Sequence, residues 1–143
     1  ALFYKVCPSS PDIKQCIFDL KNAIQSAQKL CDTIGYHGFE EDFQEAHRLL
    51  NDTDRLDNVL NGALSACVFA GMGSWNDEVA AICEDKNIPQ HQYTEVTNAL
   101  FSAILNVVCG ICSQISLTLT IQSIMCTLIV NGLNLKKRGG YIF

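Results

Sequence analysis

Cysteine is the residue type in this sequence with the clearest chemical potential. Cys109 and Cys112 are separated by two residues, which is the spacing of dithiol pairs that exchange disulfides with other proteins. Such a redox site needs a thiolate at an exposed helix start, because the thiolate is the nucleophile. Here the pair lies inside a long apolar run, where burial disfavours the thiolate. We therefore interpret this pair as structural.

The complete cysteine set also indicates a structural use of sulfur. The chain has eight cysteines, an even number that can pair completely in an oxidising compartment. No second pair stands at the spacing of a zinc site, so no metal centre is predicted. The connectivity stays open, because eight cysteines allow about 105 pairings. The residues predicted to form disulfides are Cys7, Cys16, Cys31, Cys67, Cys83, Cys109, Cys112 and Cys126.

No other constellation of side chains in the sequence predicts catalysis. His37, His47 and His91 lack the HExxH spacing of zinc proteases. No Gly-x-Ser-x-Gly elbow presents a serine as a nucleophile, and no nucleotide-binding motif occurs. We therefore predict a protein that is not an enzyme and that uses no cofactor.

Three features predict a secreted, extracellular protein. The first is the cysteine content. The second is the start at Ala1 without a methionine or a hydrophobic targeting segment, as expected after removal of a signal peptide. The third is the glycosylation sequon Asn51-Asp52-Thr53 between two expected helices, which predicts a glycan on Asn51 at an exposed corner.

Charge is distributed unevenly along the chain. The net charge is −5, yet residues 96–143 carry only the cations Lys136, Lys137 and Arg138. An acidic body disfavours a nucleic-acid partner, because phosphate binding depends on clustered cations. Residues 136–143 add a diglycine and an apolar tip to the basic triplet, which predicts a flexible basic tail. A dibasic processing site and a contact with anionic lipid are the alternatives.

The N-terminal part of the sequence is typical of amphipathic helices. Apolar residues recur at helical spacing from Ile13 to Ile34, after a cap at Ser10 and a proline at Pro11. Gly35 is expected to end this helix. Further amphipathic helices are expected at about 39–50 and 74–83, and between them a helix that is capped by Asp52 or Thr53 and carries apolar residues from Leu56 to Val68.

The segment from Val96 to Leu135 contains no Asp, Glu, Lys, Arg or His, although about a quarter of residues are charged in soluble proteins. Residues 115–121 alternate like a strand, but small or polar residues recur with a helical step along the whole segment. One helix over residues 98–131 would be about 50 Å long, and a compact chain of this size has a radius of gyration of about 14–15 Å. We therefore expect a break near Gly110, with apolar helices at roughly 94–109 and 113–131.

A membrane span is a further interpretation of this segment, since its length and apolarity suffice and a basic cluster follows it. Many polar side chains and the cysteines within it count against a span by the resting monomer. The predicted fold is therefore all-α: a disulfide-cross-linked bundle of about five to six helices. It forms one domain over residues 1–143, with a very apolar helix or hairpin at about 94–131 packed inside amphipathic helices.

Three classes of function fit this fold. The first is a non-enzymatic extracellular carrier of an apolar small molecule or lipid, although the same apolar residues could form a dry core. The second is a secreted effector or toxin that oligomerises or inserts into membranes, where small residues promote helix packing. The third is a self-assembling structural protein. A carrier would line its cavity with Ile104, Val108, Ile111, Ile115, Leu119 and Leu128.

Overall fold

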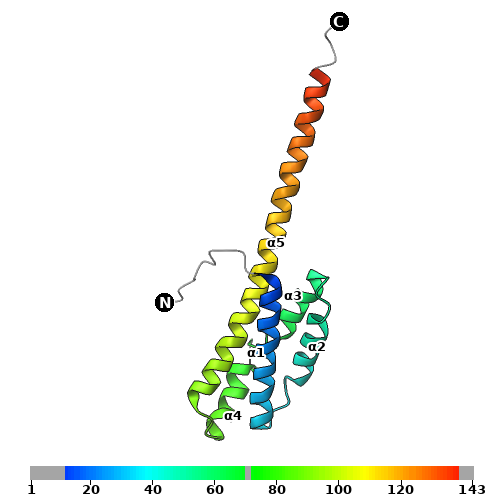
Figure 1. Ribbon diagram of the computed structural model, residues 1–143. Helices are drawn as coiled ribbons and strands as arrows, with labels where there is room; N and C mark the ends of the chain where they lie inside the picture. The colour runs from blue at the N-terminus through cyan, green and yellow to red at the C-terminus, as the bar shows by residue number, and fades with distance from the viewer. Residues whose placement is uncertain (1–11, 70–71, 139–143) are drawn as a thin grey trace. The chain divides into compact units, whose positions relative to one another are not determined.

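The computed structural model describes residues 12–69 and 72–138, with side chains as far as Thr127. No strand occurs in these described ranges, so the all-α prediction is confirmed. The helical elements, shown in Figure 1, are α1 (Ile13–Ile34), α2 (Glu40–Leu50), α3 (Leu56–Ser65), the π-helical turn η1 (Trp75–Val79), α4 (Ala80–Asp85) and α5 (Gln90–Arg138).

The chain divides into two compact units, residues 1–111 and 112–143. The first unit contains α1 to α4 and the first part of α5, and the second contains the rest of α5. One domain over the whole chain stays a prediction. The predictions for Cys7, for the cap at Ser10 and for the glycines and apolar tip of the tail concern residues outside the described ranges.

Helix α1 shows how local sequence sets the helix ends. The cap is Asp12, whose Oδ1 accepts a hydrogen bond from the Lys14 amide at 3.0 Å. Gly35 adopts a left-handed φ of 70°, and the Tyr36 amide donates to the Cys31 carbonyl at 2.9 Å. This reversal is the αL ending that glycine favours. The predicted end of α1 is therefore confirmed.

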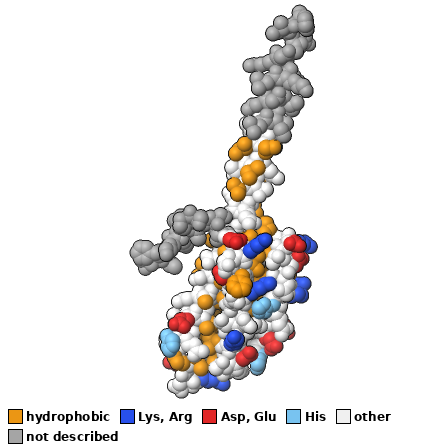
Figure 2. Space-filling view, in the orientation of Figure 1, with side chains coloured by type: hydrophobic (Ala, Val, Ile, Leu, Met, Phe, Trp, Pro, Cys, Tyr) orange, Lys and Arg blue, Asp and Glu red, His pale blue; other side chains and the backbone are white. Residues whose placement is uncertain are grey.

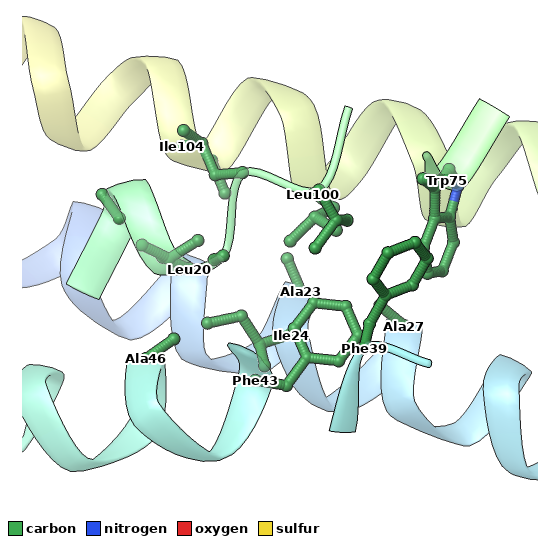
Figure 3. Packing of buried hydrophobic residues seen from close by; sticks show 14 of the residues in the cluster. Leu20, Ala23, Ile24, Ala27, Phe39, Phe43, Ala46, Trp75, Leu100 and Ile104 are labelled. Atoms are coloured by element: carbon green, nitrogen blue, oxygen red, sulfur yellow. The ribbon is translucent and has the colours of Figure 1, made fainter. Parts of the chain in front are cut away.

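The core of the first unit is built from one face of each helix. Leu20, Ile24, Phe43 and Leu100 are at most 1 % exposed, and Figure 3 shows them pointing toward one another from α1, α2 and α5. The amphipathic spacing expected from the sequence is thus the spacing of the buried residues. Each fully buried large aliphatic side chain contributes about 1.5–3 kcal/mol relative to an exposed one.

An aromatic cluster closes one end of this core around Trp75, which is fully buried. The ring centroids of Phe39, Phe43 and Tyr93 lie 6.2, 6.3 and 6.5 Å from that of Trp75. The indole Nε1 donates a hydrogen bond to Thr97 Oγ1 at 2.8 Å, which satisfies the buried donor. The cluster therefore joins η1 to both α2 and α5.

Gly62 allows α2 and α3 to pack closely. A Cβ placed on Gly62 would lie 2.8 Å from Leu50 Cγ and 3.3 Å from the Ala46 carbonyl oxygen. Gly62→Val is therefore expected to lower the free energy of unfolding by about 2 kcal/mol, the scale of overpacking a core. The measurement is urea denaturation followed by circular dichroism.

Asn61→Val is the matched control for that prediction, because Asn61 is the exposed neighbour on the same helix. It introduces the same side chain without the contact to Leu50, so its urea midpoint should stay close to that of the parent chain. Equal effects of the two valines would show that helix propensity, and not the close approach of α2 and α3, determines the loss.

The expected break near Gly110 is wrong. Helix α5 runs without interruption through Gly110, and the strand-like residues 115–121 are helical. A glycine inside a helix costs only about 1 kcal/mol relative to alanine, so flanking helix formers can carry the helix across it. Gly110 is also buried.

Only the first part of α5 packs as predicted. Leu100, Ile104, Val107 and Ile111 are at most 4 % exposed and belong to the core. On the same part of the helix, Phe101 is 45 % exposed, so one face of α5 contacts the core and the other faces solvent. The expectation that the whole segment at 94–131 is enclosed by amphipathic helices is therefore wrong for its described C-terminal side chains.

Candidate functional site

The second unit displays large apolar side chains on an exposed helix. From Cys112 to Thr127 no described side chain is buried. Figure 2 shows hydrophobic side chains along the described part of this segment. Exposed apolar surface on this scale is unusual in a monomeric soluble protein and marks an interaction site. The large residues, between 48 % and 61 % exposed, are Ile115, Leu117, Leu119, Ile121, Ile124 and Met125.

These apolar side chains cover more than half of the circumference of the helix. Successive residues of an α-helix are rotated by about 100°, so Ile115 and Leu119 project on one side and Leu117 and Ile121 on nearly the opposite side. An apolar surface this wide exceeds the stripe of about 100° with which an amphipathic helix packs against one partner surface. The arrangement therefore favours a surrounding apolar medium over one docking groove.

The dimensions of the segment match those of a lipid bilayer. Residues 112–135 contain no charged side chain and would form about 36 Å of helix. The hydrocarbon core of a typical bilayer is about 30 Å thick. The described range Gln90–Thr127 is long and apolar enough for a membrane span, with a mean hydropathy of 1.8 in a window that is 33 % buried.

Three threonine hydroxyl groups of this segment have hydrogen-bond partners within the helix. Thr118 Oγ1 donates to the Gln114 carbonyl oxygen, and Thr120 Oγ1 donates to the Ser116 carbonyl oxygen, both at 2.9 Å. Two turns further along, Thr127 Oγ1 donates to the Ser123 carbonyl oxygen, also at 2.9 Å. Internal bonds of this kind lower the cost of placing a hydroxyl in lipid, where water is absent. Polar residues therefore count less against a membrane span than their number in the sequence implies.

The predicted cavity residues are divided between two environments. Ile104 and Ile111 are 4 % and 2 % exposed in the core of the first unit, and Val108 packs against that core. Ile115 and Leu119 are 48 % and 60 % exposed in the second unit. The side chain of Leu128 lies outside the described side chains. The structure thus places Ile104, Val108 and Ile111 in or against the core, whereas Ile115 and Leu119 are exposed to solvent.

A cavity that the sequence analysis did not predict lies between α1 and α2, with a volume of about 440 Å³. Its walls combine aromatic rings with polar groups, among them Tyr36, Phe39, Gln28, Lys29 and Asp32. No periodic signal in the sequence marks these residues, because they come from two helices and the turn between them. The mixed lining does not suit an apolar ligand.

The cysteines differ from the predicted pattern. No disulfide joins any two cysteines within residues 12–69 and 72–138. Cys109 and Cys112 are both exposed, so the expected burial of this pair is wrong. Both lie in the interior of α5, away from a helix N-terminus that would stabilise a thiolate. The geometry therefore still disfavours a dithiol redox site there.

The other predicted site residues are on the surface of the first unit. Asn51 is exposed at the end of α2, and its Oδ1 accepts a hydrogen bond from Lys21 Nζ at 2.9 Å. A glycan on Asn51 stays a prediction, and the exposed turn would accommodate it.

His47 Nε2 lies 3.1 Å from Gln28 Oε1, and partial burial together with the charge of Lys21 lowers the pKa of His47. In the part of the chain that the structure describes, no three His, Cys, Asp or Glu side chains gather as metal ligands.

Comparison with known proteins adds no family to this description. No family model, curated protein or solved structure matches the chain.

Proposed function

We propose that the protein binds membranes by inserting residues 112–135 of α5 into the hydrocarbon core of a lipid bilayer. The observation that carries this proposal is the set of exposed large apolar side chains over more than half of the circumference of an uncharged helix. Removing apolar surface from water is favourable by about 25 cal/mol per Å². A bilayer surrounds a helix completely, so it can bury all of these side chains at once.

The charges that flank this segment support the same proposal. The basic cluster Lys136-Lys137-Arg138 follows the uncharged run directly. Cations immediately outside a hydrophobic span interact favourably with anionic lipid, at about 1 kcal/mol for each charge near the surface. The first unit would remain in water, where its acidic side chains are solvated.

The secretory pathway is the location that we propose for this membrane. Eight cysteines and the sequon at Asn51 suit an oxidising, glycosylating compartment. In this proposal the cysteines of the first unit pair there, and the first unit faces the lumen or the exterior. A membrane-inserting effector or toxin is the functional class that combines secretion with insertion.

A second copy of the chain is the alternative partner for the same helix. Cys112, Ser113, Ser116 and Thr120 line a shallow groove along one side of the segment together with Leu117. Small side chains let two helices approach closely within a membrane. This observation favours oligomerisation after insertion, which is compatible with the effector class.

Flotation with lipid vesicles tests the proposed function. The full chain is synthesised in the presence of phosphatidylcholine vesicles, with or without phosphatidylserine, and the vesicles are then washed with alkaline carbonate and floated on a density gradient. We expect the protein to float with the vesicles after the wash, because an inserted helix resists carbonate. Recovery in the carbonate supernatant, or as a lipid-free sedimenting oligomer, would overturn insertion.

A further inference from the structure

The cavity between α1 and α2 has the size and the lining of a site for a small ligand. Its volume of about 440 Å³ lies within the range of small-molecule sites, which is about 300–1,000 Å³. Buried side chains form its floor, because Cys31, Phe39 and Phe43 are at most 9 % exposed. Exposed polar side chains form its rim. A ligand that fits would therefore place an apolar part inward and a polar part toward solvent.

Three aromatic rings form a continuous wall of this cavity. The ring centroids of Tyr36 and Phe39 are 5.4 Å apart and those of Phe39 and Phe43 are 6.3 Å apart, both in edge-to-face arrangements. Gly38 leaves room for the Tyr36 ring, because a Cβ placed on Gly38 would overlap the Tyr36 hydroxyl oxygen. Aromatic side chains bind other rings through stacked or edge-to-face contacts. The wall therefore favours a ligand that contains an aromatic ring.

The charges around the cavity favour a cation. Asp32 in the last turn of α1 and Glu40 in the first turn of α2 both line the rim. The C-terminal end of α1 adds negative potential, because a helix dipole is negative at that end and no basic residue lies in the last turn of α1. The positive end of α2 is offset by three acidic residues in its first turn. Lys29 is the opposing cation of the lining and is exposed, and His37 Nδ1 lies 3.7 Å from Glu40 Oε2.

The Cys31 thiol in the floor does not make this a site for covalent chemistry. Burial raises the pKa of Cys31 to about 11, and the charge of Asp32 raises it further. A thiol with this pKa keeps its proton at neutral pH, whereas the thiolate is the nucleophile. The cavity therefore suits reversible binding.

We propose that this cavity binds small aromatic amines. The aromatic ring lies against Phe39 and Phe43, and the ammonium group lies near Asp32 and Glu40. The Tyr36 ring adds attraction, because a cation is stabilised at the face of an aromatic ring. The ring and the charge are recognised by different groups, so a ligand that lacks either one binds more weakly. The site belongs to the first unit, and the proposal does not depend on membrane insertion.

Isothermal titration calorimetry with three ligands that share one ring tests the proposal. Tryptamine carries the ammonium group, tryptophol replaces it with a neutral hydroxyl, and indole-3-propionate replaces it with a carboxylate. Each ligand is titrated into the full chain in phosphatidylcholine vesicles, and vesicles without protein give the blank. We expect tryptamine to bind saturably, tryptophol to bind about fivefold more weakly, which is the scale of a partly exposed ion pair, and indole-3-propionate to bind more weakly still.

Two results of this titration would overturn the proposal. The first is the absence of saturable tryptamine binding, and the second is an affinity for tryptophol or indole-3-propionate that equals the affinity for tryptamine. Flotation of the same samples reports on membrane insertion separately, so failure of amine binding and failure of insertion are told apart.

Isosteric substitutions on the rim locate the bound charge. Asp32→Asn and Glu40→Gln are each expected to weaken tryptamine binding about fivefold and to leave tryptophol binding unchanged. Lys29→Gln removes the opposing cation and should strengthen tryptamine binding about twofold. Asp19→Asn is the matched control, because Asp19 is an exposed acid on α1 outside the cavity lining. Equal losses in Asp32→Asn and Asp19→Asn would show that net charge, and not this cavity, attracts the amine.

Discussion

Ile124→Arg is expected to abolish recovery of the protein with carbonate-washed vesicles. Ile124 is 55 % exposed and lies at the centre of residues 112–135, so an inserted helix would place it near the middle of the bilayer. Arginine at the centre of a membrane helix costs about 2.5–3.5 kcal/mol in insertion experiments. The equilibrium between inserted and free protein should therefore shift by about 100-fold toward free protein.

Leu64→Arg is the matched control for this prediction. Leu64 is also 55 % exposed and also lies on a helix, but it belongs to α3 in the first unit. The same added charge at this position should leave flotation unchanged. If both variants lose flotation equally, net charge and not the hydrophobic segment controls membrane binding. If neither does, residues 112–135 are not inserted.

Trp75→Ala is expected to have the largest effect on the stability of the first unit. Replacing a buried tryptophan by alanine costs about 3–5 kcal/mol, through lost burial and the cavity left behind. The substitution also leaves Thr97 Oγ1 without the hydrogen bond from Nε1, and it removes the ring that Phe39, Phe43 and Tyr93 contact. Since small domains unfold with about 5–15 kcal/mol, much of the stability should be lost.

Urea denaturation followed by circular dichroism measures this loss. Met72→Ala is the control, because Met72 is fully exposed and its truncation should change the free energy of unfolding by at most about 0.5 kcal/mol. Trp75→Phe should fall between the two, since phenylalanine keeps an aromatic ring but cannot donate to Thr97. A Trp75→Ala loss as small as that of Met72→Ala would contradict the central place of Trp75 in the core.

The helices of the first unit were predictable because local signals and tertiary packing agree there. From Ile13 to Ile34 the apolar spacing is helical, and Gly35 supplies the left-handed residue that ends α1. The N-terminal cap of α1 was harder to place, because serine and aspartate are both good caps and the sequence offers Ser10 and Asp12 two residues apart. In the structure the cap is Asp12.

The expected cap of the third helix at Asp52 or Thr53 is wrong, because α3 begins at Leu56 after Arg55, and it ends at Ser65 instead of reaching Val68. The expected helix at 74–83 begins as the π-helical turn η1.

The candidate site was harder to predict, because its environment depends on how much core the other helices offer. Ile104 and Ile115 are the same residue type, and both lie in an uncharged sequence with helical spacing. In the structure, Ile104 reaches the core at 4 % exposure, whereas Ile115 remains 48 % exposed. Periodicity predicts that a residue is helical, but it cannot say where the partner helices end.

A count of polar residues overstates the cost of placing residues 112–127 in lipid, for a physical reason. Serine and threonine are polar in a sequence count, yet in a helix their hydroxyls can donate to the carbonyl one turn back. Thr118, Thr120 and Thr127 all do so. The cost of transfer to lipid depends on satisfied hydrogen bonds, which composition does not record.

The buried position of Trp75 gives the protein an optical reporter for only one of its units. The chain has one tryptophan, and residues 112–138 contain no tryptophan, tyrosine or phenylalanine. Tryptophan emission therefore follows the packing around Trp75 and does not report on the surroundings of residues 112–138. A vesicle titration that removes residues 112–135 from water while the tryptophan emission stays constant would show that the first unit keeps its core throughout insertion.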